Sequence, residues 1–341
     1  MADASGWRSL LRTLAKYGIA LGALAWVLYA TNVSRAVDTI SQLSATTLVL
    51  VMVVSVAGVL ARVTMWYVLV TYFGETDLKR LVTADLIIKF VNSLFPSRLS
   101  GRSIAPIALR HFTGLAWNRA VAVTVAHTGL YAVLYGLVTL VGLAADIDAY
   151  GPGLTVVVLL SVGAYLTVGG AVVLAGWRLD VFDRLVAWIA RLADSLPTGG
   201  TVATALDRFR VKMLDGSDEQ FRLLVRDPRT VALFVVTWIT ALMLVPAVRI
   251  WILLAATGVT ELDPLLLPLY IIVAYSVTVL PLTPGGIGVA EATAVAVFVA
   301  LGVPEGAIVS VVFLDRVFGV YLPSLAGWIP LVQTDFRSVI D

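Results

Sequence analysis

The sequence contains no cysteine and only two histidines among its 341 residues, and only 13% of its residues are charged. The lack of cysteine excludes disulfides, thiolate chemistry and iron–sulfur clusters, and it leaves no Cys/His zinc site. A phosphate-binding loop ending in GK[ST], an HExxH helix, a GxSxG turn and an interleaved basic–aromatic surface for nucleic acid are also missing. We therefore expect no metal, no cofactor, no nucleic-acid partner and no catalytic residue.

Apolar residues are abundant instead, making up 60% of the chain, and the mean hydropathy is +0.95. So little polar surface cannot cover a soluble domain of this size, which predicts an all-α polytopic membrane protein with residues 1–341 as one transmembrane domain. A helix needs about 20 apolar residues to cross a bilayer. On this basis, full spans are predicted near residues 16–32, 46–72, 119–143, 153–176, 230–257 and 307–331.

Two further apolar segments, 81–112 and 264–301, are interrupted by "LFPSRLSG" and "LPLTPGG". Every backbone polar group in hydrocarbon must be paired, so such breaks are tolerated only where protein or a water-filled cavity surrounds them. Each segment is predicted to form either a re-entrant hairpin or two short, closely joined crossings. Both arrangements return the chain to the side from which it came.

The distribution of basic residues predicts the orientation. Most of the 24 Lys and Arg residues fall on inner segments if both termini are cytoplasmic, whereas the loops "ADIDAY" and "TGVTELDP" carry acids and no base. The sequence thus predicts a multi-pass plasma-membrane protein with cytoplasmic N- and C-termini. The basic insert 177–229 is predicted to be a cytoplasmic amphipathic connector at the interface, with sensing of the membrane surface as the alternative.

The two broken segments and their flanks resemble each other at a spacing of about 185 residues. Arg62 matches Arg249, Pro96 matches Pro281, and His127 matches Asp315 in the same order along the chain. The topology places the first copy, about 46–143, inverted relative to the second, about 230–331. We therefore predict an inverted repeat with two broken hairpins around a central polar cavity, an architecture of many secondary transporters.

"LPLTPGGIGVAEA", followed by "LGVP" and "FLDRVFG", resembles the C-terminal signature of the lysylphosphatidylglycerol synthase transmembrane (flippase) family. "LFPSRLSGRSIAPIALRHFTGL" resembles its N-terminal counterpart. The resemblance implies a stand-alone lipid translocator that moves a charged head group across the bilayer. The sequence departs from the family pattern at "SGRS", where Arg102 replaces an acidic residue, and this favours a phosphate over an aminoacylated head group.

The candidate substrate-binding residues lie at both breaks. Arg98, Arg102 and Arg110 flank the first and are predicted to bind a phosphate, unless they are anchors at the inner surface. The second break is predicted to present free amides to an anion at a helix N-terminus. Glu291 is expected to face Arg316; it could instead pair with a cationic head group, take a proton during transport, or serve only as a helix cap or fixed ion pair. The residues assigned to the second break are Pro284, Gly285, Gly286, Gly288, Glu291 and Arg316.

Six secondary candidates are Arg62, Arg249, Asp85, Lys89, His127 and Asp315. The two matched arginines are expected to bind carbonyls freed by the opposing break, or to snorkel. Asp85 and Lys89, four residues apart on one helix, are expected to neutralise each other, with proton coupling as the alternative. His127 is expected to be a satisfied buried histidine rather than a proton relay. Asp315 is not expected to pair with the adjacent Arg316, because neighbouring helix positions point in different directions.

The leading hypothesis is a flippase-like translocator, not an enzyme, whose partners are membrane lipids. One alternative is a membrane enzyme acting on lipid-linked substrates with Glu291 or Asp315 as general base, although no paired carboxylates at helical spacing support it. Another is a scaffold that positions a separate lipid-modifying enzyme through 177–229. The sequence leaves the lipid, the direction of movement, the energy source and the oligomeric state open.

Overall fold

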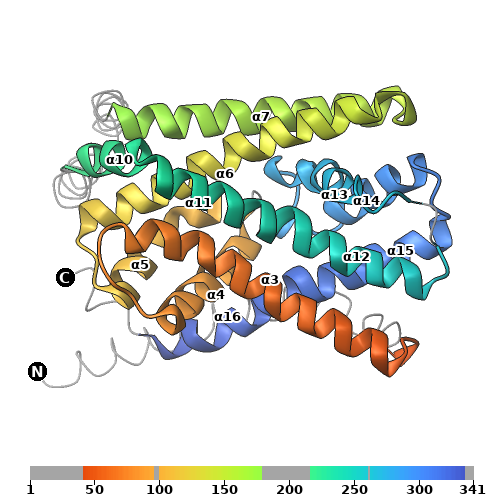
Figure 1. Cartoon of the computed structure of the whole chain (residues 1–341), viewed down its shortest axis with the longest axis horizontal. Coiled ribbons are helices and arrows are strands. Elements are labelled where there is room, and N and C mark those ends of the chain that lie inside the picture. The colour runs from red at the N-terminus through yellow and green to blue at the C-terminus, as the bar shows by residue number, and fades with distance from the viewer. Residues whose placement is uncertain (1–40, 96–99, 179–215, 260–261, 335–341) are drawn as a thin grey trace, which may run out of the picture.

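The computed structural model describes residues 41–95, 100–178, 216–259 and 262–334, and all its regular elements over these ranges are helices (Figure 1). The predicted span 16–32, Arg98 and most of the insert 177–229 lie outside the described residues. The all-helical prediction is confirmed for the described part of the chain.

Five of the described helical stretches are long and apolar enough to cross a membrane, and they confirm the five predicted spans that fall within the described residues. Two of these stretches contain a π-helical turn, Thr240–Leu244 in one and Val317–Tyr321 in the other. The stretches are α3 (Ala45–Thr71), α6 (Trp117–Ala145), α7 (Pro152–Trp177), α11 (Pro228–Ile239) continued by α12 (Val245–Ala256), and α15 (Glu305–Arg316) continued by α16 (Leu322–Gln333).

Shorter helices form the two broken segments, and the breaks fall where proline and glycine interrupt the sequence. The first segment contains α4 (Leu78–Leu94), a 3-10 turn (Ser100–Ile104) and α5 (Ala105–Thr113). The second contains α13 (Leu267–Tyr275), 3-10 turns at Ser276–Val279 and Pro284–Gly286, and α14 (Val289–Ala300). In both segments the two short helices pack against each other, α4 on α5 and α13 on α14.

The two breaks contact each other. The amide of Gly285 in the second break donates to the carbonyl of Phe95, which follows α4, at 2.8 Å. Figure 1 shows α4 and α5 toward one end of the helix bundle and α13 and α14 toward the other. Backbone groups released by one break are thus partly satisfied by the other, as burial in hydrocarbon requires.

Of the predicted insert, the structure describes α10 (Ser217–Arg226), which packs against α6 and α7. Phe221 and Leu224 form its buried face. The hydroxyl of Tyr72, after α3, donates to the carbonyl of Leu223 at 3.2 Å. This short helix is therefore fixed against the bundle where α7 ends and α11 begins.

The outer faces of the bundle are apolar. Val53 and Val56 on α3 and Leu160 and Leu174 on α7 are each about 60% exposed, as expected for side chains that contact lipid. By contrast, half of the residues in the most apolar 18-residue section of α6 are buried inside the bundle. The buried ion pairs join other helices inside the bundle: α3 with α4, α12 with α15, and α14 with α15.

Candidate functional site

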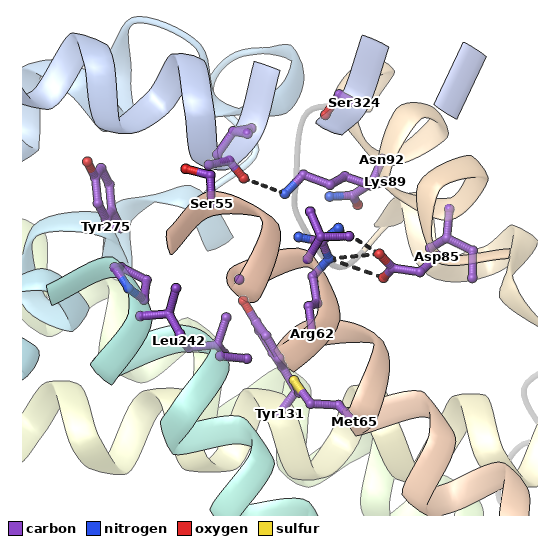
Figure 2. A pocket seen from close by; sticks show the side chains of 18 of the residues that line it. Ser55, Arg62, Met65, Asp85, Lys89, Asn92, Tyr131, Leu242, Tyr275 and Ser324 are labelled. Carbon is purple, nitrogen blue, oxygen red and sulfur yellow. Dashed lines mark hydrogen bonds and ion pairs between the residues drawn. The ribbon is translucent and has the colours of Figure 1, made fainter. Parts of the chain in front are cut away.

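A cavity of about 190 Å³ lies among the broken helices and the long helices (Figure 2). Its lining comes from the central part of four of the five long stretches: residues 55–66 of α3, 127–135 of α6, 241–249 of the π-helical turn and α12, and 315–324 from α15 to α16. Because these segments are close to the midpoint of helices long enough to span a bilayer, the cavity lies near the middle of the membrane. The remaining wall comes from the C-terminal half of α4, the 3-10 turn that carries Arg102, α13 and Gly285.

Among the described residues, the cavity wall carries more positive than negative charge. Five basic side chains line it, whereas only Asp85 and Asp315 contribute carboxylates, and Glu291 adds a third from just behind Arg316. The basic residues are Arg62, Lys89, Arg102, Arg249 and Arg316. A surplus of cations in a water-poor site favours an anionic ligand over a cationic one.

Arg62 on α3 forms an ion pair with Asp85 on α4, as Figure 2 shows. The Arg62 Nη2 and Nε atoms donate to Asp85 Oδ2 at 2.6 and 2.9 Å, and Trp66 Nε1 donates to Oδ1 at 3.3 Å. The prediction that Asp85 and Lys89 neutralise each other is therefore wrong. Lys89 Nζ donates to the carbonyl of Gly319 at 2.8 Å, because a long side chain near a facing helix reaches across the interface.

Arg249 on α12 pairs with Asp315 on α15, and both side chains are at most 6% exposed. Arg249 Nε lies 2.7 Å from Asp315 Oδ1, and the Tyr275 hydroxyl donates to Oδ2 at 2.7 Å. The expectation that Arg62 and Arg249 bind freed carbonyls is wrong, since each has a carboxylate, which compensates a buried guanidinium more fully than a carbonyl does. Arg249 is also too deeply buried to snorkel. The prediction that Asp315 and Arg316 do not pair is confirmed.

Glu291 and Arg316 face each other as predicted, with Arg316 Nε donating to Glu291 Oε1 at 2.7 Å. The Tyr321 hydroxyl also donates to Oε1, and the Gly288 amide donates to Oε2 at 2.6 Å. Arg316 Nη2 lies 3.4 Å from the carbonyl of Gly285, so the pair ties the second break to α15. Arg316 is therefore held by the break and lines the cavity at the same time.

The expectation of free amides at the second break is wrong. The amide of Gly285 is bound to Phe95, that of Gly286 donates to Thr283 at 2.9 Å, and that of Gly288 is bound to Glu291. Pro284 has no amide hydrogen to offer. Glu291 lies in the first turn of α14, where a carboxylate is favoured by the helix dipole, and it is the anion at this helix N-terminus.

Glycine at this break is required by the backbone. Gly285, Gly286 and Gly288 have φ values of 62°, 70° and 85°, a region that other residues rarely adopt. A Cβ atom on Gly285 would also lie 2.9 Å from the carbonyl oxygen of Ser93. Among the residues assigned to this break, Gly285 and Arg316 line the cavity, whereas Pro284, Gly286 and Gly288 shape the turn.

At the first break, Arg102 lines the cavity with its Cζ atom 3.8 Å from the centroid of the Tyr131 ring. Arg110 does not line it; this side chain donates to the carbonyl of Leu115 at 3.4 Å and lies 5.0 Å from the ring centroid of Trp117. The structure therefore brings only Arg102 of the predicted arginine cluster to the cavity, Arg98 being outside the described residues.

His127 is buried as predicted, with 3% of its surface exposed, and it lines the cavity. Its ring is stacked on Trp66, with centroids 3.6 Å apart. The expectation that it is satisfied is wrong, because neither ring nitrogen has a hydrogen-bond partner among the described residues. The rings of Trp66, Tyr131 and Phe234 pack against the imidazole, and they leave both of its nitrogens without a hydrogen bond.

Several cavity residues were missed by the sequence analysis. Tyr275, Asn92 and Ser324 all line the cavity, and the first of them holds Asp315. A polar side chain within an apolar helix is expensive in a membrane, so Asn92 and Ser324 carried a usable signal. The two π-helical turns, which also reach the cavity, occur often at functional sites but have no sequence signature of their own.

The fold and the site define an all-helical, multi-pass membrane protein with a cation-rich cavity between interrupted helices. The chain belongs to the family described as the lysylphosphatidylglycerol synthase TM region, which matches residues 13–327. It is also similar to a UPF0104 membrane protein of Methanothermobacter thermautotrophicus, with 23% identity over 257 residues that cover 71% of this chain and 70% of the relative. The resemblance inferred from the two break motifs is thereby confirmed.

Proposed function

We propose that this protein is a lipid translocator that moves a phosphate-bearing head group across the bilayer while the lipid tails stay in the membrane. The observation that carries the proposal is the cation-rich cavity at the middle of four spanning helices. Charges at this depth are costly and are retained mainly where they serve a ligand path or pair with each other. Membership of the lysylphosphatidylglycerol synthase TM family is consistent with a lipid-related role.

The proposed mechanism uses the two breaks as halves of an alternating-access device. Residues 46–143 and 230–331 would be inverted repeats whose re-entrant hairpins open to opposite sides of the plasma membrane. In support, each half carries a matched arginine paired with a carboxylate, Arg62 with Asp85 and Arg249 with Asp315. Rocking of one half against the other would require the Gly285–Phe95 hydrogen bond between the breaks to open.

The proposal treats the protein as a carrier and not as an enzyme, with membrane lipids as its partners and a separate lipid-modifying enzyme as a further one. Among the described residues, the three carboxylates at the cavity are bound by arginines, which leaves none of the three poised to act as a general base in this arrangement. Conversion of a lipid without any change of leaflet would contradict the carrier proposal.

Arg102→Gln is expected to slow translocation of an anionic lipid by roughly 10- to 100-fold, because a charge-assisted hydrogen bond to the ligand is worth about 1.5–3 kcal/mol. The rate is measured in proteoliposomes as the loss of fluorescence of a labelled anionic phospholipid when a membrane-impermeant quencher is added. Arg110→Gln is the matched control, since Arg110 lies on the same broken segment but does not line the cavity. Equal rates for the wild type and Arg102→Gln would rule out this binding role.

The proposed orientation is testable because the chain has no native cysteine. A cysteine at exposed Asp148, between α6 and α7, is expected to react with an impermeant maleimide in intact cells. A cysteine at exposed Glu75, between α3 and α4, is expected to react only after the membrane is permeabilised. The opposite labelling pattern would invert the proposed topology and place both termini outside.

A further inference from the structure

The cavity contains neutral polar atoms that are buried and without a hydrogen-bond partner among the described residues. They are both ring nitrogens of His127, the hydroxyl oxygen of Ser324 and the side-chain oxygen of Asn92. His127 and Ser324 are 3% and 1% exposed, so these atoms do not face bulk water. Buried polar groups in proteins are almost always paired, and unpaired ones call for an explanation such as a ligand.

The His127 ring is held in place and cannot turn its nitrogens to another partner within the packed helices. One face is stacked on Trp66 with the ring planes 7° apart, and Phe234 meets it edge to face at a centroid distance of 5.5 Å. A neutral imidazole offers one donor and one acceptor nitrogen. Both kinds of hydrogen bond are therefore available at one point of the cavity wall.

The hydrogen-bond acceptors among these atoms require a ligand that can donate hydrogen bonds. The unprotonated nitrogen of His127 and the oxygen of Asn92 can only accept hydrogen bonds, and Ser324 can do either. The oxygens of a phosphodiester also only accept, so a phosphate alone cannot satisfy this wall. The ligand must carry hydrogen-bond donors of its own.

Those donors are hydroxyls rather than ammonium groups. A cationic head group needs a carboxylate, and Asp85, Asp315 and Glu291 are already bound by arginines. The cation surplus at the cavity would also repel an ammonium. Hydroxyl groups are neutral and both donate and accept, which matches the imidazole, the amide and the serine.

Building on the function proposed above, we infer that the transported head group is a polyol joined through a phosphate, such as a glycerol or a sugar. Arg102 lies against Tyr131, one helical turn from His127, so a phosphate held by Arg102 would bring neighbouring hydroxyls toward the imidazole. The cavity of about 190 Å³ exceeds the ~30 Å³ share of a water molecule several-fold, which leaves room for hydroxyls beside the phosphate.

The test compares two short-chain lipids of equal charge and similar size, phosphatidylglycerol and phosphatidylpropanol, which differ by the two hydroxyls of the head group. Binding to the full chain in detergent is measured by calorimetry. The wild type is expected to bind phosphatidylglycerol at least about tenfold more tightly, since a site built to hydrogen-bond hydroxyls rejects the analogue that lacks them. Phosphatidylethanolamine is expected to bind at least as weakly as phosphatidylpropanol.

His127→Phe keeps a ring on Trp66 but removes both nitrogens, and it is expected to reduce the affinity for phosphatidylglycerol to that for phosphatidylpropanol. If His127→Phe fails to fold, Ser324→Ala should reduce the ratio of the affinity for phosphatidylglycerol to the affinity for phosphatidylpropanol. Thr128→Val is the control, because Thr128 also has a buried hydroxyl oxygen without a partner but does not line the cavity. This control should leave the ratio unchanged.

The outcomes separate the two proposals. Equal affinity of the wild type for the two anionic lipids, or preference for phosphatidylethanolamine, would overturn the polyol inference and leave the anion-binding function standing. No binding of any anionic lipid would overturn the proposed function together with the inference. If both His127→Phe and Ser324→Ala keep the wild-type preference for phosphatidylglycerol over phosphatidylpropanol, other groups recognise the hydroxyls. That result would overturn the assignment of His127 and Ser324 to this role.

Discussion

Asp315→Leu is expected to lower the free energy of unfolding by about 3–5 kcal/mol, because it leaves the guanidinium of Arg249 buried without a carboxylate. Arg249 is 5% exposed, and its pocket is closed by Gly319, where an added Cβ atom would lie 2.3 Å from Arg249 Nη2. The arginine therefore has little room to move to another partner. Unfolding of the purified protein in detergent, followed by circular dichroism against denaturant, measures the effect.

Adding Arg249→Met to Asp315→Leu is expected to recover most of this loss, since removing both charges also removes their desolvation cost. Asp218→Ala is the matched control for an exposed pair, because Arg222 on α10 pairs with Asp218 while 40% of its side chain is exposed. Such a pair is worth roughly 0–1 kcal/mol. A double variant as unstable as Asp315→Leu alone would show that the loss does not come from the unpaired arginine.

The positions of the helices could be predicted from the sequence because hydrocarbon imposes one strong rule on them. Long apolar runs with few charges must be helices, and the described spans agree with those predictions. The breaks were equally predictable, since Pro281, Pro284 and the positive-φ glycines after them cannot continue a helix. The apolar runs determine where the helices lie, and proline and glycine determine where they break. Both can be read directly from one sequence.

The partners of the charged residues could be predicted only in part. Spacing along one helix predicted an ion pair between Asp85 and Lys89. Asp85 pairs instead with Arg62 of α3, and Lys89 donates to the carbonyl of Gly319, which is distant in the sequence. The Glu291–Arg316 pair was predictable because each charge needed a partner and lay near the same break. Where several carboxylates compete for several arginines, the choice depends on helix packing, which spacing does not encode.

The second break shows a different limit. Proline and glycine predicted its place but not the use of its amides, which depends on the three-dimensional turn. Gly285 donates to Phe95 from the other broken segment, and Gly288 donates to the Glu291 carboxylate three residues on. The anion expected at this helix end is therefore a residue of the chain itself. Recognition of a ligand falls instead to side chains from four long helical stretches and α4, together with Arg102 in the 3-10 turn of the first broken segment.

Gly327→Ala is expected to destabilise the protein by about 1–3 kcal/mol, toward the upper end, because a Cβ atom there would lie 1.9 Å from the carbonyl oxygen of Leu86. The backbones of α16 and α4 touch at this point, as small residues permit between membrane helices. Neither atom belongs to a flexible side chain, so relief requires one helix to move. Thermal unfolding in detergent measures the change.

Gly170→Ala is the control, since a Cβ atom on this glycine of α7 would meet nothing within 4 Å. Alanine there is expected to raise stability by about 0.5–1 kcal/mol through its helix preference. Displacement of α4 by Gly327→Ala should also pull Lys89 from the Gly319 carbonyl and slow lipid movement at temperatures where the protein is still folded. A Gly327→Ala protein with the stability and transport rate of the wild type would contradict this prediction. It would show that α4 and α16 have room for a Cβ atom between them, and that the cavity wall does not depend on their close contact.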